Sequence, residues 1–124
     1  MPARKVVEWV NSQAVETLFL SAVSLAELLS GIAALPEGRR KAGLSEALDE
    51  QMRLLFSERI LSFDASAAYA YAAVVTTARR AGRPIGHADA QIAAIATIHD
   101  FTMASRDAAP FETVGLRVVN PWLS

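Results

Sequence analysis

The chain has 124 residues, of which 52% are hydrophobic and 20% charged, so its length fits one domain of ~100–150 residues with an apolar core. Twelve basic and thirteen acidic residues give a net charge of −1, which excludes an overall positive field that would attract nucleic acid or an anionic membrane. There is no cysteine and no uncharged run of the ~18 residues that a membrane span needs, so we expect a single cytoplasmic domain over residues 1–124, without a membrane association.

Five helices are predicted in chain order from apolar residues spaced three and four apart. The fourth has Asp64 directly before it, in the position of an N-cap, and Gly82 and Pro84 beyond its end. The segments that define the five helices are Val6/Trp9/Val10, Leu25/Leu28/Leu29/Ile32, Leu44/Leu48/Met52/Leu55, residues 65–80, and Ala88/Ile92/Ile95/His99.

Three short apolar segments near turn signals are predicted to be buried strands. They are residues 17–21, 101–105 and 116–119, and residues 60–63 form a fourth candidate that is too brief to assign. Helices between short apolar strands favour parallel pairing through crossovers, and parallel sheets need helices on both faces. We therefore predict a helix-rich α/β fold with a short, mostly parallel sheet flanked by helices.

Acidic residues stand near the ends of two predicted strands and at the start of one helix. Glu27 comes six residues after Ser21, and Asp107 comes two residues after Ser105. Asp89 opens the fifth predicted helix. In open α/β sheets the ligand crevice lies beyond the carboxyl ends of the strands, and three carboxylates gathered there would repel one another unless a cation neutralised them. Oxygen ligands suit Mg²⁺ or Mn²⁺, so we predict a metal site at these three residues.

Each of these carboxylates also has a purely structural interpretation. Ser24 and Glu27 fit a Ser-x-x-Glu capping box, in which the carboxylate would satisfy a backbone N–H at the start of a helix. Asp89 fits an ordinary acidic residue of a first helical turn, and Asp107 fits a cap of the short turn before Pro110. Both interpretations stay open at the level of the sequence.

Four stretches of the chain, with a fifth closing it, carry a resemblance to a known family. They are residues 19–31 with Glu-Leu-x-x-Gly, 60–64, 82–94 with Ala-Asp-Ala-Gln-Ile-Ala, 101–107 with Ser-Arg-Asp, and 119–122. In this order they resemble the PIN-domain family, and within it the VapC-type toxins of bacterial type II toxin–antitoxin pairs. The resemblance implies a three-layer PIN-like fold and a Mg²⁺-dependent endoribonuclease, with Mn²⁺ as an alternative metal. Its catalytic and metal-binding acids fall on Glu27, Asp89 and Asp107.

The resemblance also implies partners for the chain. They are an RNA substrate, a cognate VapB-type antitoxin, and a second copy of the chain in a homodimer. Cations near the acidic site would have to hold the RNA backbone, and Arg79, Arg80, Arg83 and Arg106 are candidates, although such arginines also mark solvated helix ends. The apolar stripe of the third predicted helix is a candidate surface for the protein partners.

The family pattern departs from this chain at its start. The family begins with an apolar strand that ends in Asp and supplies a central strand and the first metal-binding acid, whereas residues 1–4 resemble the helix that follows this strand. We therefore expect either a start codon assigned too late or a true truncation, and in both cases weaker Mg²⁺ binding and marginal stability for the chain as printed. The alternative function is a catalytically impaired PIN-like module that binds an antitoxin or itself.

Overall fold

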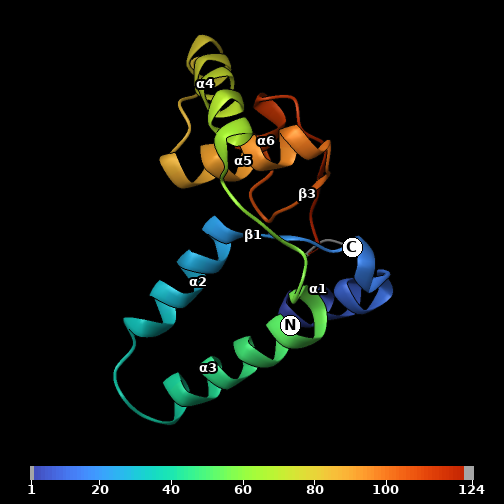
Figure 1. Ribbon diagram of the computed structural model, residues 1–124, viewed down its shortest axis with the longest axis vertical. Helices are drawn as coiled ribbons and strands as arrows, with labels where there is room; N and C mark the ends of the chain where they lie inside the picture. Colours follow the sequence, from blue (N-terminus) through green and yellow to red (C-terminus); the bar gives the residue numbers. More distant parts are fainter. Residues whose placement is uncertain (1, 122–124) are drawn as a thin grey trace. The chain divides into compact units, whose positions relative to one another are not determined.

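The computed structural model describes residues 2–121, which divide into two compact units (Figure 1). The first unit comprises residues 2–13 and 63–121, and the second comprises residues 14–62. Trp122, at the end of the closing family-like stretch, lies outside the described residues. The assignment of the chain to one domain stays a prediction.

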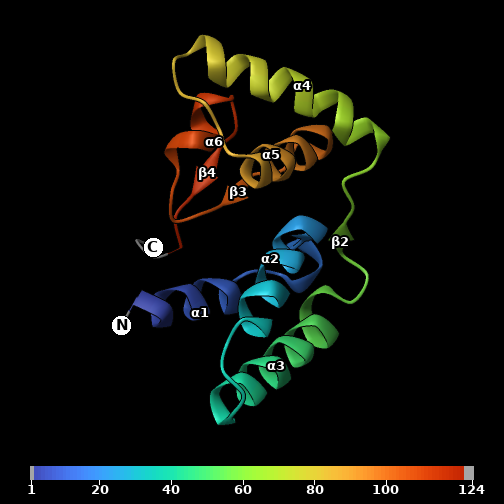
Figure 2. The ribbon, with the colours of Figure 1, turned by 90° about the vertical axis from the view of Figure 1, so that its left-hand side faces the viewer.

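The first unit contains three of the five predicted helices and two of the predicted strands. Its elements are α1 (Pro2–Ser12), α4 (Ala65–Arg80), α5 (His87–His99), β3 (Met103–Ala104), α6 (Ala109–Thr113) and β4 (Val118–Val119). Strands β3 and β4 pair in parallel with Met103 opposite Val118, as expected for strands joined by a crossover. Helix α6 forms that crossover and was not predicted from the sequence. Figure 2 shows α4 lying across α5, with α6 and the two strands beside α5.

Helix α5 is the buried centre of the first unit. Four of its alanines, together with Ile95, are at most 6% exposed. Because an alanine side chain ends at Cβ, the neighbouring elements can approach α5 closely on several sides. Val74 of α4 and Phe111 of α6 pack against Ala90 and Ala93 of α5. A helix that is apolar on most of its faces is typical of such a buried position.

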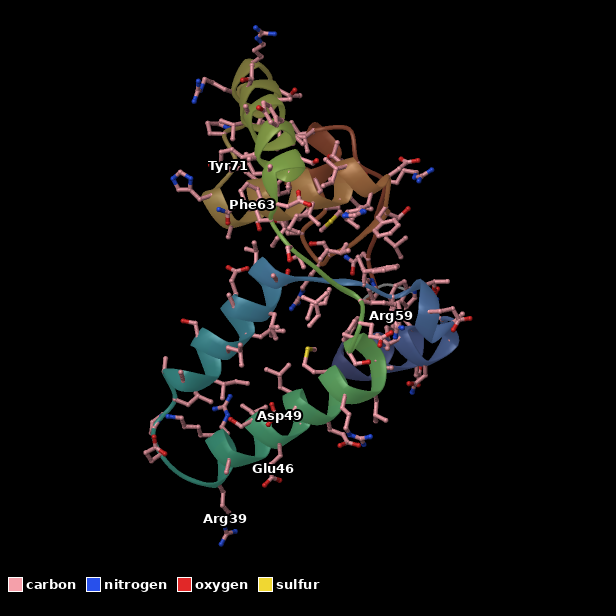
Figure 3. The ribbon with its side chains drawn as sticks, in the orientation of Figure 1. Arg39, Glu46, Asp49, Arg59, Phe63 and Tyr71 are labelled. Carbon is pink, nitrogen blue, oxygen red and sulfur yellow. The ribbon has the colours of Figure 1, made fainter. Side chains whose placement is uncertain are left out.

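Side-chain contacts join the start of α4 to the start of α5. Asp64 is the N-cap of α4, as predicted, and its carboxylate accepts a hydrogen bond from the backbone N–H of Ala67 at 3.0 Å. The rings of Phe63 and Tyr71 meet edge to face, 5.9 Å apart (Figure 3). The hydroxyl of Tyr71 is hydrogen bonded to Nδ1 of His87, the first residue of α5, at 2.9 Å. The first turn of α5 is therefore fixed by α4.

The second unit contains the other two predicted helices and a pair of parallel strands. Its elements are η1 (Val15–Thr17), β1 (Leu20–Ser21), α2 (Ala22–Ala33), α3 (Arg39–Gln51), η2 (Met52–Phe56) and β2 (Ile60–Leu61). Leu20 pairs with Ile60 in parallel register, so the brief fourth candidate segment does form a strand. The predicted strand over residues 17–21 is shorter than expected, because residues 15–17 form a 3₁₀ turn.

Hydrogen bonds of Arg59 connect three segments of the second unit. Its Nε donates a hydrogen bond to the carbonyl of Leu18 at 2.9 Å, and a terminal guanidinium nitrogen donates to the carbonyl of Leu55. Its own carbonyl accepts a hydrogen bond from the N–H of Leu20 at 3.0 Å. The half-buried guanidinium, labelled in Figure 3, therefore satisfies carbonyls before β1 and within η2 and fixes the start of β2.

The predicted fold class is confirmed, since short parallel strands stand among predominating helices. Each ladder is only two residues long, so helix packing and side-chain hydrogen bonds hold most of each unit together. Over residues 2–121, no helix combines the length and the apolar character that crossing a membrane requires.

We predict that enlarging the buried face of α5 destabilises the protein. Ala93→Leu places an isobutyl group at a position that is 0% exposed, and overpacking of this kind costs about 1–3 kcal/mol of the free energy of unfolding. The control Ala73→Leu lies on the exposed side of α4 and should change that free energy by less than about 0.5 kcal/mol. Urea denaturation of both variants measures the difference, and equal midpoints would contradict the tight packing around α5.

Candidate functional site

Glu27 lies in the second turn of α2, because the helix begins earlier than the capping-box interpretation requires. The cap is Ser21, whose hydroxyl accepts a hydrogen bond from the N–H of Ser24 at 2.9 Å and donates one to the Ser24 hydroxyl at 2.8 Å. Ser21 has extended backbone angles at the end of β1, which suits an N-cap at the junction of strand and helix. The capping box of Ser24 and Glu27 is therefore wrong.

The Glu27 side chain stands in a shallow groove along one side of α2. The groove has a volume of about 530 Å³. Its lining, besides Glu27, consists of small or short side chains: Val23, Ala26, Ser30, Gly31 and Ala34. Glu27 is exposed, and within residues 2–121 its carboxylate has neither a hydrogen bond nor an ion pair. The groove leaves this carboxylate open to a ligand from solvent.

Asp89 is the third residue of α5 and is half-buried. The N-cap of α5 is Gly86, which has no side chain to cap the helix. The prediction of an acid in the first turn is confirmed, and the positive end of the helix dipole favours a carboxylate there. No hydrogen bond or ion pair of the Asp89 side chain is present among the described residues. Its position therefore serves the helix electrostatically and leaves its oxygens available.

Asp107 lies in a turn directly after β3 that two other side chains hold. The hydroxyl of Ser105 accepts a hydrogen bond from the N–H of Asp107 at 3.2 Å and donates one to its carbonyl at 3.1 Å. Nδ2 of Asn120, after β4, donates to the carbonyl of Arg106 at 3.3 Å. The N-cap of α6 is Ala108, without a side-chain cap, so the carboxylate of Asp107 does not cap the turn before α6.

Ser105 and Asn120 hold the backbone of the turn around Asp107, and neither was predicted to have a role. Both fall inside the family-like stretches, residues 101–107 and 119–122. A serine two residues before an acidic residue at the end of a strand is a typical signal of a turn held by a hydroxyl group, and this signal was available in the sequence. The contact of Asn120 depends on the pairing of β3 with β4, so no local pattern indicates it.

The three carboxylates are distributed over both units: Glu27 belongs to the second, whereas Asp89 and Asp107 belong to the first. In the part of the chain that the structure describes, no three histidine or acidic side chains are grouped closely enough to hold a metal ion. Glu27, Asp89 and Asp107 offer carboxylate oxygens only, and such oxygen ligands fit Mg²⁺ or Mn²⁺. The convergence of the three residues on one ion stays a prediction.

Comparisons with known proteins match almost the whole chain. The PIN domain family model matches residues 2–115. The plasmid stability protein StbB of Pseudomonas syringae pv. tomato is 46% identical over 121 residues, which are 98% of this chain and 87% of that protein. The VapC ribonuclease Y4jK of Sinorhizobium fredii is 42% identical over 98% of this chain and 86% of its own length. The toxin FitB of Neisseria gonorrhoeae is 40% identical, with coverages of 98% and 87%.

A solved structure agrees with the sequence matches. The crystal structure of FitAcB from Neisseria gonorrhoeae superposes with a TM-score of 0.88 and 40% identity, over 96% of this chain and 86% of that one. The family match, the relatives and the similar fold cover the stretches that contain Glu27, Asp89 and Asp107. The chain belongs to the PIN-domain family and is of the VapC type.

Proposed function

We propose that this protein is a metal-dependent ribonuclease toxin of a toxin–antitoxin pair, and that Glu27, Asp89 and Asp107 hold its Mg²⁺. Relatives named as a VapC ribonuclease and as a toxin support a toxin nuclease. The observation that carries the assignment of the three acids is that none of them caps a helix. The N-caps of the nearby helices α2, α5 and α6 are Ser21, Gly86 and Ala108.

The three carboxylates suit the binding of a hard cation at a phosphodiester. Bound Mg²⁺ supplies charge neutralisation at the phosphate and activation of the attacking water. The residues of the chain orient the ligands: the first turn of α5 presents Asp89 at the positive end of a helix, and the Ser105 hydroxyl fixes the backbone of Asp107. Mn²⁺ accepts the same oxygen ligands and is the alternative ion.

We also propose a protein partner, a VapB-type antitoxin, and a homodimer. Supporting this is apolar surface on the second unit, where Leu28, Leu29 and Leu54 are 47%, 51% and 56% exposed. In the stripe of the third predicted helix, Leu44 is 40% exposed whereas Leu48 is buried at 8% exposure, so only part of that stripe is open to a partner. Exposed leucines on the surface of a small unit are typical of surfaces that bind another chain.

We predict that each of the three acids is needed for cleavage. Glu27→Gln, Asp89→Asn and Asp107→Asn should each lower Mg²⁺-dependent cleavage of a single-stranded RNA by about 100-fold or more, because each removes a charged ligand of the ion. The matched control is Asp100→Asn, at the other end of α5. Asp100 has a left-handed backbone with φ of 54°, which asparagine adopts readily, so its activity and stability should be unchanged.

The same assay distinguishes the alternative function. Cleavage that persists in EDTA, or loss of cleavage in Asp100→Asn equal to that in Asp89→Asn, would contradict the metal-site assignment. A wild-type protein that cleaves no RNA with Mg²⁺ or Mn²⁺, yet binds a small protein encoded beside it, would be the catalytically impaired module.

We predict a separate effect for Ser105, which acts through Asp107. Ser105→Ala removes both hydroxyl hydrogen bonds of the turn, so cleavage should fall by about 10–100-fold, as for residues that orient metal ligands. The free energy of unfolding should fall by only about 1 kcal/mol. Ser105→Thr keeps the hydroxyl and should restore cleavage. The control Ser66→Ala, exposed on α4, should leave cleavage unchanged; a loss in Ser105→Thr equal to that in Ser105→Ala would refute the role of the hydroxyl.

A further inference from the structure

The charge of the chain is unevenly distributed along its sequence. The longest stretch without an acidic residue runs from Ala65 to Ala88, and it contains Arg79, Arg80 and Arg83. Three of the twelve basic residues of the protein thus fall within five consecutive positions, in a chain whose net charge is −1. A local positive field is expected at these positions although the whole chain has none.

The backbone brings these three arginines to one end of α4. The N–H of Arg83 donates to the carbonyl of Ala78 at 2.9 Å, and the N–H of Gly82 donates to the carbonyl of Arg79 at 3.0 Å. Gly82 has a φ of 71°, so this is a Schellman turn, which folds the chain back over the end of the helix. Figure 2 shows this end of α4 and the loop that leads from it to α5. Because backbone groups satisfy these terminal carbonyls, the arginine side chains are not required as caps.

The three side chains are exposed, and none has a hydrogen bond or an ion pair among residues 2–121. Two basic residues of the second unit have a different environment. Lys41 pairs with Glu37 at 2.7 Å, and Arg53 of η2 pairs with Glu50 of α3 at 2.7 Å. Figure 3 shows Glu46 and Asp49 farther along α3 from Arg39. Two of the positive charges there are paired with nearby carboxylates, whereas the three at the end of α4 have no such pair among the described residues.

The end of α4 lies close along the chain to a proposed metal ligand. Arg83 precedes Asp89 by six positions, and the last three residues of this segment, 87–89, lie in the first turn of α5. From the reach of an extended chain and the geometry of a helix, their Cα atoms are at most about 20 Å apart. Phosphates of one nucleic-acid strand repeat every ~3.4 Å along a duplex axis, so this distance spans only a few nucleotides. The hydrogen bond of Tyr71 with His87 fixes the intervening start of α5.

We propose that Arg79, Arg80 and Arg83 form a phosphate-binding surface that holds the RNA backbone beside Asp89. This inference rests on the proposed ribonuclease function and adds where the substrate strand runs. An acidic metal site repels a polyanion, and an unbalanced group of guanidinium groups a few nucleotides away offsets that repulsion. A role limited to the helix dipole accounts for basic residues in the last turn of α4, but it predicts an effect on stability and none on RNA binding.

The test is the salt dependence of RNA binding. The triple variant Arg79→Gln/Arg80→Gln/Arg83→Gln is compared with its parent. Binding of a labelled single-stranded RNA is measured by fluorescence anisotropy at several salt concentrations between about 50 and 300 mM, a range over which the release of counterions changes the affinity. Both proteins carry Asp107→Asn, so the RNA stays intact in Mg²⁺. If all three arginines contact phosphates, the log–log slope should become shallower by about 2, since each contact contributes ~0.7 for a single strand, and the affinity should fall tenfold or more at low salt.

Two further variants separate charge from structure. The triple lysine variant, Arg79→Lys/Arg80→Lys/Arg83→Lys, keeps the charges and should keep most of the slope. The charge-matched control Arg39→Gln/Arg40→Gln/Arg53→Gln removes three arginines from the second unit and should bind RNA as the parent does. Thermal midpoints of all variants identify any that fail to fold, and in that event single Arg83→Gln, outside the helix, should still reduce the slope by about 0.7.

The outcomes distinguish this surface from the function on which it rests. If the wild-type protein cleaves RNA and the triple glutamine variant binds it with unchanged slope and affinity, the surface is refuted and the ribonuclease stands. Unchanged RNA binding together with weaker binding of the cognate antitoxin would instead assign the arginines to a protein partner. If the wild-type protein neither binds nor cleaves RNA, both proposals fall.

Discussion

The close packing of helices around the small side chains of α5 is the constraint on which the first unit depends. Ala90 and Ala93 are 0% exposed, and they leave room for Val74 of α4 and Phe111 of α6 at the same helix. This packing fixes the positions of α4 and α6 against α5. Helix α4 leads into the turn that carries the arginines, and α6 joins β3 to β4. The packing also fixes the axis of α5, and therefore the position of the first turn in which Asp89 stands. A larger residue at either alanine would displace all of these elements together.

Hydroxyl and amide groups, more than the strand ladders, set the local geometry around the other two acids. Ser21, the last residue of β1, caps α2, and Ser105 holds the turn after β3, so a serine at or just after each of these two strands fixes the approach to an acidic residue. Asn120 supports the second of these turns from the paired strand. A ladder of two residues supplies few backbone hydrogen bonds, which explains why these side chains are needed. In a metal-dependent nuclease, they are the groups that would keep ligands in place before the ion binds.

Much of the fold was predictable because it follows from local periodicity. The five longer helices, α1 to α5, were predicted, and Asp64 was predicted as a cap because a helix pattern begins directly after it. The capping box at Ser24 was wrong because Ser21 and Ser24 both fit an N-cap and only the end of β1 decides between them. Helix α6 has five residues, too few to show a period, and the strand at residues 60–61 depends on a partner forty residues away. For the same reason the convergence of Glu27 with Asp89 and Asp107 stays a prediction, drawn from their places after strands or at a helix start and from the family resemblance, since no local pattern encodes a contact between distant segments.

The proposal that these three acids bind one metal centre is tested by a crystal structure of the protein soaked with Mn²⁺, in which the ion is located by its anomalous scattering. We expect one ion, or two ions about 3.5–4 Å apart, ligated by carboxylate oxygens of Glu27, Asp89 and Asp107 at distances of ~2.2 Å. Crystals of Glu27→Gln soaked in the same way should show lower occupancy at that position. An ion bound by other residues, or carboxyl groups more than about 10 Å apart with Mn²⁺ present, would contradict the claim, because no one or two ions and their waters bridge such a distance.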